Sequence, residues 1–249
     1  MVKTASRGAR VRVEPGQKRV RAYLAGHLVL DSRAPLLVWE SPYYPQYYIP
    51  VGDVRAELRP TGETRRSPSR GDAEVYDVVV DEVTAPSAGW RSPASPVQDL
   101  RGTVRFDWDA MEAWFEEEEQ VYVHPRNPYT RIDILPSSAE VRVELDGEVI
   151  AESGRAMVLF ETGLPARYYL PKTDARQDLL VSSTTETGCP YKGTATYYSI
   201  DTGARRVDDA VWCYPAPLPE SIRVAGLLSF DPRKDDLRIT VDGEPLEQQ

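Results

Sequence analysis

The sequence is poor in the residues that most often bind metals or carry out acid–base catalysis near neutral pH. Its 249 residues include two cysteines, Cys189 and Cys213, and two histidines, His27 and His124. Two separated cysteines do not form the Cys-x-x-Cys pairs of a structural zinc site. We therefore expect no metal site and no cofactor. The thiols are expected to be reduced, with a Cys189–Cys213 disulfide as the alternative.

Long hydrophobic runs are also absent. No apolar stretch approaches the roughly 20 residues that cross a membrane, and Met1–Arg12 lacks the apolar core of a secretion signal. A net charge of −9 disfavours nucleic acid and anionic membranes as partners, because clustered lysine and arginine bind phosphate groups. These features predict a cytoplasmic protein that binds neither nucleic acid nor membrane.

Proline and tyrosine are plentiful instead. The 21 prolines argue against long helices and favour short elements separated by turns. The 14 tyrosines, against 4 phenylalanines, suit half-buried strands. Short alternating segments such as Thr194–Ile200 recur at intervals of about ten residues, which predicts a mostly β fold of antiparallel sheets.

The chain repeats itself at an interval of roughly 120 residues. Val20–Val29 aligns with Val141–Ile150, and each segment fits a strand, a glycine turn and a returning strand. The Asp146-Gly147 pair is a strong hairpin signal. Further matches align Leu36–Glu40 with Met157–Glu161, Tyr47–Pro50 with Tyr168–Pro171, and Asp53 with Asp174. We predict two tandem copies of one domain that pack against each other.

The copies differ most at one short motif. Ser67–Gly71 aligns with Cys189–Gly193, which has the sequence Cys-Pro-Tyr-Lys-Gly, and Trp90 aligns with Trp212. The first copy lacks the cysteine, the tyrosine and the lysine of this motif. We therefore predict that the first copy is degenerate and that a functional site lies in the second.

The predicted organisation has four parts: a flexible tail (1–16), the first copy (17–108), a joining segment (109–137) and the second copy (138–249). In the first copy, the proline-rich stretches Pro60–Asp72 and Thr84–Pro96 are expected to be loops. In the joining segment, Met111–Phe115 fits either a helical turn or a strand.

Three motifs in this order resemble a known family. Tyr168–Pro171 (Tyr-Tyr-Leu-Pro), Cys189–Gly193 and Ala210–Pro215 (Ala-Val-Trp-Cys-Tyr-Pro) look like domain-of-unknown-function family 427, which some catalogues label nucleotidyltransferase-like. The tandem form, with a joining segment such as His124–Arg131, is similar to actinobacterial members. The resemblance covers nearly the whole chain beyond the tail. It implies a β-tent fold, in which two antiparallel sheets lean together over a cleft, and it implies no settled activity.

Cys189, Lys192 and His124 are the candidate catalytic residues. A nearby ammonium lowers the pKa of a thiol and so activates it, and a turn at Pro190 would bring Cys189 and Lys192 to one side. His124 is the candidate general acid or base. The alternatives are a thiol that lines a pocket, a buried structural cysteine, and a histidine that braces the two copies.

Seven further residues are predicted to bind a ligand. Aromatic rings and cations from separate segments would meet in one cleft if two sheets lean together, and would suit a small molecule with a flat part and a carboxylate or phosphate. These residues are Arg167, Tyr168, Tyr191, Trp212, Tyr214, Arg176 and Glu161. The alternative is a tyrosine-rich core whose cations pair with Glu161 or Asp174.

Three functions fit these residues. The first is a small-molecule-binding protein, with or without enzymatic activity, that uses the cleft of the second copy. The second is a non-catalytic recognition or structural module. The third is a nucleotidyltransferase, although the sequence shows no glycine-rich phosphate loop and no well-spaced carboxylate pair for Mg²⁺.

Overall fold

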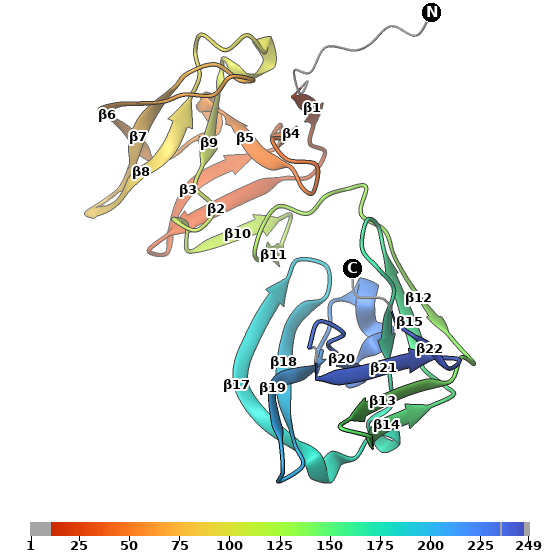
Figure 1. Ribbon diagram of the computed structural model, residues 1–249. Helices are drawn as coiled ribbons and strands as arrows, with labels where there is room; N and C mark the ends of the chain where they lie inside the picture. The colour runs from red at the N-terminus through yellow and green to blue at the C-terminus, as the bar shows by residue number, and fades with distance from the viewer. Residues whose placement is uncertain (1–10, 235, 247–249) are drawn as a thin grey trace, which may run out of the picture. The chain divides into compact units, whose positions relative to one another are not determined.

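The computed structural model describes residues 11–234 and 236–246 and divides the chain into two compact units, Met1–Asn127 (unit 1) and Pro128–Gln249 (unit 2) (Figure 1). Both units are built of antiparallel strands joined by turns and short 3-10 helices. The predicted mostly β fold class is therefore confirmed. No helix in the described part of the chain is long and apolar enough to cross a membrane.

Unit 1 forms one large and one small sheet from its described residues. Its strands are β1 (Arg12–Pro15), β2 (Val20–Leu24), β3 (His27–Ser32), β4 (Leu36–Trp39), β5 (Gln46–Pro50), β6 (Glu57–Arg65), β7 (Ala73–Val80), β8 (Val83–Arg91), β9 (Thr103–Phe106), β10 (Ala113–Glu116) and β11 (Glu119–Val121), with the 3-10 helices η1 (Val51–Asp53) and η2 (Gln98–Leu100). The seven-stranded sheet has the order β1-β4-β5-β9-β8-β7-β6, and the four-stranded sheet has the order β11-β10-β2-β3.

The two sheets of unit 1 share one apolar core. The β2–β3 hairpin turns at Ala25 and Gly26, whose φ angles of 50° and 77° are those a tight two-residue turn requires. Period-two alternation then directs Ala22 of the small sheet, and Ile49 and Val104 of the large sheet, into the same buried cluster. The core thus lies between the sheets.

Unit 2 has the same kinds of element. Its strands are β12 (Ile132–Pro136), β13 (Val141–Leu145), β14 (Glu148–Ser153), β15 (Met157–Glu161), β16 (Arg167–Tyr169), β17 (Leu180–Cys189), β18 (Gly193–Asp201), β19 (Arg206–Cys213), β20 (Leu228–Phe230), β21 (Leu237–Val241) and β22 (Glu244–Pro245), with the 3-10 helices η3 (Lys172–Asp174), η4 (Gln177–Leu179) and η5 (Pro219–Val224). They form the sheets β12-β15-β16, β17-β18-β19-β20 and β14-β13-β21-β22.

The strand order of unit 2 repeats that of unit 1. An isolated bridge between Leu170 and Leu228 joins β12-β15-β16 to β20-β19-β18-β17. The equivalent place in unit 1 is the Ile49–Val104 pair, where β5 meets β9. The joined sheet therefore follows the order of the seven-stranded sheet of unit 1, and the tandem duplication predicted from the sequence is confirmed at the level of topology.

A buried serine bound to an aspartate recurs in both units. Ser32 donates its hydroxyl hydrogen bond to Asp53 at 2.6 Å, and Ser153 donates to Asp174 at 2.7 Å. All four residues stand at matching positions of the repeat. In each unit this contact ties the end of the second strand of the small sheet to a 3-10 helix.

The expected tail is too long. Residues 1–10 lie outside the described residues, but Arg12–Pro15 form strand β1, which pairs with Leu36–Trp39 of β4. Val11 and Val13 pack against a small buried cluster around Leu100, and the Arg12 guanidinium lies 4.4 Å from the centre of the Trp39 ring. These apolar contacts place the segment in the sheet despite its basic composition.

The loop expected over Thr84–Pro96 is largely strand β8. Pro86 lies where the register shifts between the Tyr76 and Val78 pairs, and Ser87 there has a φ of 51°. A bulge needs no ladder hydrogen bond from the proline, so Pro86 does not break the strand. Similarly, β6 continues through Pro60 because it is an edge strand. Of Met111–Phe115, which fitted either a helical turn or a strand, the residues from Ala113 on lie in strand β10, in which buried and half-buried side chains alternate.

The Ser153–Asp174 contact predicts an acid-dependent loss of stability. Hydrogen bonds from Arg155, together with that from Ser153, hold the pKa of Asp174 well below its usual range although burial opposes this. A carboxyl whose pKa is lower in the folded than in the unfolded state stabilises the fold at pH values above its unfolded-state pKa of about 4. We expect Asp174→Asn to lower the free energy of unfolding by about 1–2 kcal/mol at pH 7.

Calorimetry at pH 7 and at pH 3 measures this loss, which should shrink at the lower pH because Asp174 of the unfolded wild type then binds a proton that the folded protein excludes. Asp178→Asn is the control, because Asp178 forms an exposed pair with Arg176 and should matter little. An equal loss at both pH values would refute the electrostatic explanation.

Candidate functional site

Unit 2 contains a pocket of about 230 Å³ at the place where the sequence motifs converge. Its walls come from β15, β16, β18 and β19 and from the turn between β17 and β18. The lining residues are Leu159, Glu161, Leu164, Pro165, Arg167, Tyr169, Lys192, Tyr197, Trp212, Tyr214 and Arg233. Aromatic rings and cations thus predominate.

A largely buried ion pair lies in the pocket wall. Lys192 Nζ donates to Glu161 Oε2 at 2.5 Å, and the two side chains are 11% and 9% exposed. Glu161 ends β15, and Lys192 belongs to the turn that follows Cys189. Gly193 closes that turn with a φ of 90°, a conformation that side chains disfavour.

The protonation state of Lys192 follows from this pair. Burial alone would lower the pKa of Lys192, but negative charge on Cys189 and on Glu161, with the hydrogen bond to Glu161, raises it above its ordinary value. Lys192 is therefore a cation at neutral pH. It can orient an anion or stabilise negative charge, whereas a nucleophilic amine would need a lowered pKa.

The aromatic side of the pocket centres on Tyr169. This residue is 1% exposed, its hydroxyl oxygen accepts a 3.2 Å hydrogen bond from Trp212 Nε1, and the two rings meet edge to face. Burial raises the pKa of Tyr169 and raises that of Tyr214 further. Both phenols are therefore neutral at physiological pH and offer hydrogen bonds and flat apolar surface.

Arg167 lines the pocket and pairs with no carboxylate in the part of the chain that the structure describes. Its Nη1 is buried and has no hydrogen-bond partner among residues 11–234 and 236–246. Arg233, by contrast, donates two hydrogen bonds of 2.9 Å to Asp231. A buried guanidinium nitrogen without an acceptor is costly, and an anionic group on a ligand would satisfy it.

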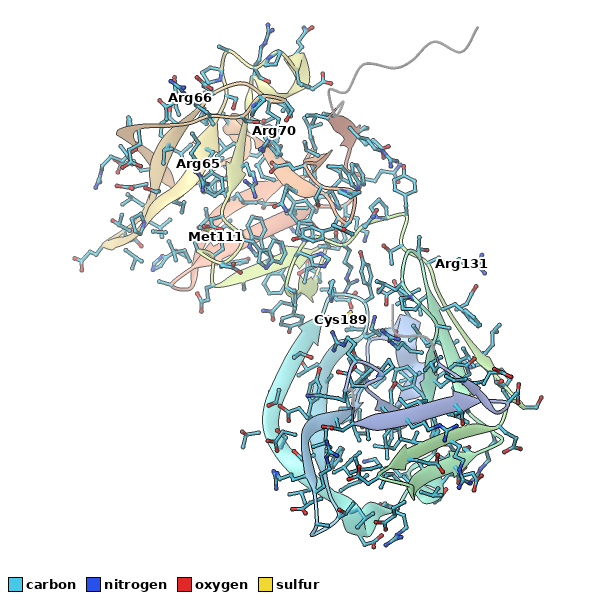
Figure 2. The ribbon with its side chains drawn as sticks, in the orientation of Figure 1. Arg65, Arg66, Arg70, Met111, Arg131 and Cys189 are labelled. Carbon is cyan, nitrogen blue, oxygen red and sulfur yellow. The ribbon has the colours of Figure 1, made fainter. Side chains whose placement is uncertain are left out.

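Cys189 lies beside this pocket. It is half-buried at the end of β17, where it pairs with Gly193, and it interacts electrostatically with Lys192, Tyr169 and Tyr214. Figure 2 labels Cys189. It is not one of the lining residues. Both cysteines are free thiols, so the alternative of a Cys189–Cys213 disulfide is wrong.

Several predicted site residues lie away from the pocket. Tyr168 packs against the larger core of unit 2, because neighbouring residues of a strand face opposite sides and Tyr169 takes the pocket side. Tyr191 is buried, with its carbonyl accepting a hydrogen bond from Ser221. Arg176 pairs with Asp178 and Glu148.

His124 belongs to unit 1, whereas Cys189 and Lys192 belong to unit 2. Its ring stacks on Tyr44 with 3.8 Å between centroids, and its Nδ1 lies 2.8 Å from the Pro125 carbonyl oxygen. These contacts lie within unit 1 and do not test the predictions that His124 is a general acid or base or braces the two copies.

Sequence analysis missed Tyr169, Tyr197 and Arg233 as pocket residues. Period-two alternation from Tyr169 back to Arg167 would have shown that these two side chains share a face of β16. Arg233 carries no such signal, since it follows β20 in an irregular segment. Among the described residues, no three His, Cys, Asp or Glu side chains come together as a metal-binding group.

The first copy retains more of the site than its motif suggests. Arg70, aligned with Lys192, forms an ion pair with Glu40, which is aligned with Glu161. Tyr48, aligned with Tyr169, donates to Glu40 at 2.7 Å and accepts from Arg70 at 3.0 Å. Burial and the Glu40 charge raise the pKa of Tyr48 to about 12. The carboxylate, the cation and the tyrosine are therefore present in both copies.

Fold and site together define a duplicated antiparallel β protein that has a charged and aromatic pocket in its second copy and the same carboxylate, cation and tyrosine contacts in its first. The family described as Domain of unknown function (DUF427), with the short name NTP_transf_9, matches residues 12–117 and 133–243. The matched segments comprise most of the chain, so the chain belongs to this family, and each of them covers one copy. A comparison with curated proteins found no match.

Removal of one partner of the buried pair should be more damaging than removal of both. Lys192→Met leaves the Glu161 carboxylate buried without its partner, and we expect a loss of about 3 kcal/mol in the free energy of unfolding. The double variant Lys192→Met/Glu161→Leu should recover part of this loss. Because the pKa of Lys192 is raised in the folded state, the ion pair should stabilise the wild type fully at neutral pH. This stabilisation should fall as the pH rises above about 10.4, the usual pKa of a lysine.

Denaturant titration of the three proteins at pH 7, with the wild type and Lys192→Met repeated at pH 11, measures these differences. Additive losses in the double variant would mean that the two charges do not interact.

Proposed function

We propose that the pocket of unit 2 binds a small molecule that has a flat, largely apolar part and one anionic group. The observation that carries the proposal is Arg167, whose buried Nη1 lacks an acceptor among the described residues, in a pocket lined by Tyr169, Tyr197, Trp212 and Tyr214. Aromatic rings offer a stacking surface for a flat group, and a guanidinium offers paired donors to a carboxylate.

Lys192 supports the same assignment. Its ammonium has three N–H donors, of which one is used by Glu161. Within the described residues Nζ has no second hydrogen-bond acceptor. A ligand oxygen near Arg167 and Lys192 would then meet two cations and one carboxylate, which leaves the site favourable for a single negative charge.

The size of the pocket restricts the ligand. A volume of about 230 Å³ is below the roughly 300–1,000 Å³ of pockets that enclose drug-sized molecules. The proposed ligand class is therefore a compact aromatic or cyclic carboxylate rather than a whole nucleotide. Recognition without catalysis is sufficient to explain these features, and a reaction at Cys189 is an additional step with a test of its own.

Binding can be tested with benzoate, 4-hydroxybenzoate and indole-3-acetate as probes. We expect at least one to raise the melting temperature of the full chain, because a ligand of the folded state stabilises it. Arg167→Met and Trp212→Leu should weaken binding by about tenfold or more in calorimetry. Arg176→Met is the matched control, since Arg176 lies in an exposed pair outside the pocket. If all three variants bind as the parent does, the pocket is not the site.

The role of Cys189 is tested by separating binding from turnover. We expect Cys189→Ser to retain probe affinity within about twofold, because the thiol does not line the pocket. If a substrate is found in a metabolite screen, loss of turnover with retained affinity would assign catalysis to this thiol. Full turnover in Cys189→Ser would exclude thiol catalysis. Mg²⁺-dependent nucleotide binding, measured by calorimetry, tests the nucleotidyltransferase alternative.

A further inference from the structure

Unit 1 has a pocket of its own, and its chemistry differs from that of unit 2. It has a volume of about 240 Å³ and lies at the end of the β6–β7 hairpin, against β5, β8 and β9. The lining residues are Tyr48, Arg65, Arg66, Ser67, Arg70, Gly71, Ala73, Trp90, Ser92 and Arg105. Figure 2 labels three of these arginines, Arg65, Arg66 and Arg70, over the same part of the large sheet.

Positive charge in this pocket is not balanced. Four arginines line it. Among the described residues, Glu40 is the one carboxylate that pairs with any of them: it forms an ion pair with Arg70 and lies 3.4 Å from Arg105 Nε. In the described part of the chain, neither Arg65 nor Arg66 forms an ion pair. The whole chain carries a net charge of −9, so this local excess of cations does not follow from composition.

Two of the arginines are held in place by an aromatic ring. The guanidinium carbons of Arg65 and Arg105 lie 4.5 and 4.8 Å from the centre of the Trp90 ring. Stacking of a guanidinium on a ring fixes its plane and leaves its N–H edges available to a ligand. Arg105 Nε is buried and lies 3.4 Å from Glu40, but it forms no hydrogen bond with any described residue. Part of the donor set is therefore oriented before any ligand binds.

The second copy lacks this cluster at the matching positions. Arg65 aligns with Thr187 by strand register. Arg65 pairs with Ala73 in the β6–β7 hairpin, and Thr187 pairs with Ala195 in the equivalent β17–β18 hairpin. Arg66 then aligns with Gly188, and Arg105 with Ser229. The three arginines that differ line the pocket of unit 1, whereas Tyr48, Arg70 and Trp90, which also line it, have a tyrosine, a cation and a tryptophan at the matching positions of unit 2. The two copies therefore present different side chains to their pockets on the same backbone frame.

We propose that the unit 1 pocket binds a small phosphate-bearing molecule, such as a phosphomonoester. A phosphomonoester carries close to two negative charges near neutral pH and three acceptor oxygens, which suits several convergent guanidinium groups better than a single carboxylate does. The volume of about 240 Å³ suits a phosphate with a small substituent. This site is separate from the one proposed in unit 2, and neither proposal depends on the other.

Calorimetry of the full chain with phenyl phosphate and with inorganic phosphate at pH 7.5 tests the proposal. We expect phenyl phosphate to bind, and Arg65→Gln and Arg66→Gln each to weaken binding by about tenfold. Both side chains are exposed and without ion pairs in the described chain, so these variants should keep the parent melting temperature. Arg59→Gln is the matched control on the same strand, because Arg59 pairs with Glu57 outside the pocket.

Three outcomes would overturn the inference. One is the absence of binding at millimolar phenyl phosphate, and another is an equal loss of affinity in Arg59→Gln, which would indicate general charge attraction. The third is tighter binding of a single-stranded oligonucleotide with the same arginine dependence, which would assign the pocket to nucleic acid. Arg167→Met, which alters unit 2, should leave phosphate binding unchanged, so failure of either proposed site can be told from failure of the other.

Discussion

A carboxylate buried at the end of an apolar strand is the constraint on which each pocket depends. Glu40 follows β4 and Glu161 ends β15, and both are largely removed from water. A buried carboxylate without a partner costs several kcal/mol, so a cation must reach it. Arg70 and Lys192 supply that cation from equivalent turns, which places each turn beside the tyrosine and tryptophan of the neighbouring strands.

Both copies have the buried carboxylate and its cation, but the other side chains that line the two pockets differ. In unit 1, three further arginines and Trp90 line the pocket, which is the basis of the proposed phosphate site. In unit 2, four aromatic rings line the pocket, and Arg167 has no carboxylate partner within the described residues. The strand order is the same in both. A shared backbone with exchanged side chains is how one fold accommodates different ligands.

Much of the fold follows from local patterns. The hairpin at Asp146-Gly147 forms as expected, with φ angles of 50° and 85°, because a two-residue turn favours such residues. The errors arose where a long-range contact overrides local composition. Thr84–Pro96 was expected to be a loop, yet β8 forms there because a bulge accommodates Pro86. Arg12–Pro15 looked like tail, yet pairing with β4 makes it a strand.

The sequence by itself determined the duplication, the antiparallel β class and the turns, because these depend on spacing, period-two alternation and glycine conformations that act over a few residues. The tertiary structure decided which side chains share a pocket. Tyr169 rather than Tyr168 faces the pocket, and Lys192 forms an ion pair with Glu161. The guanidinium groups of Arg65 and Arg105 both stack on the Trp90 ring. Those contacts join residues tens of positions apart, and their geometry depends on strand pairing and on the cost of burying charge, which no local pattern records.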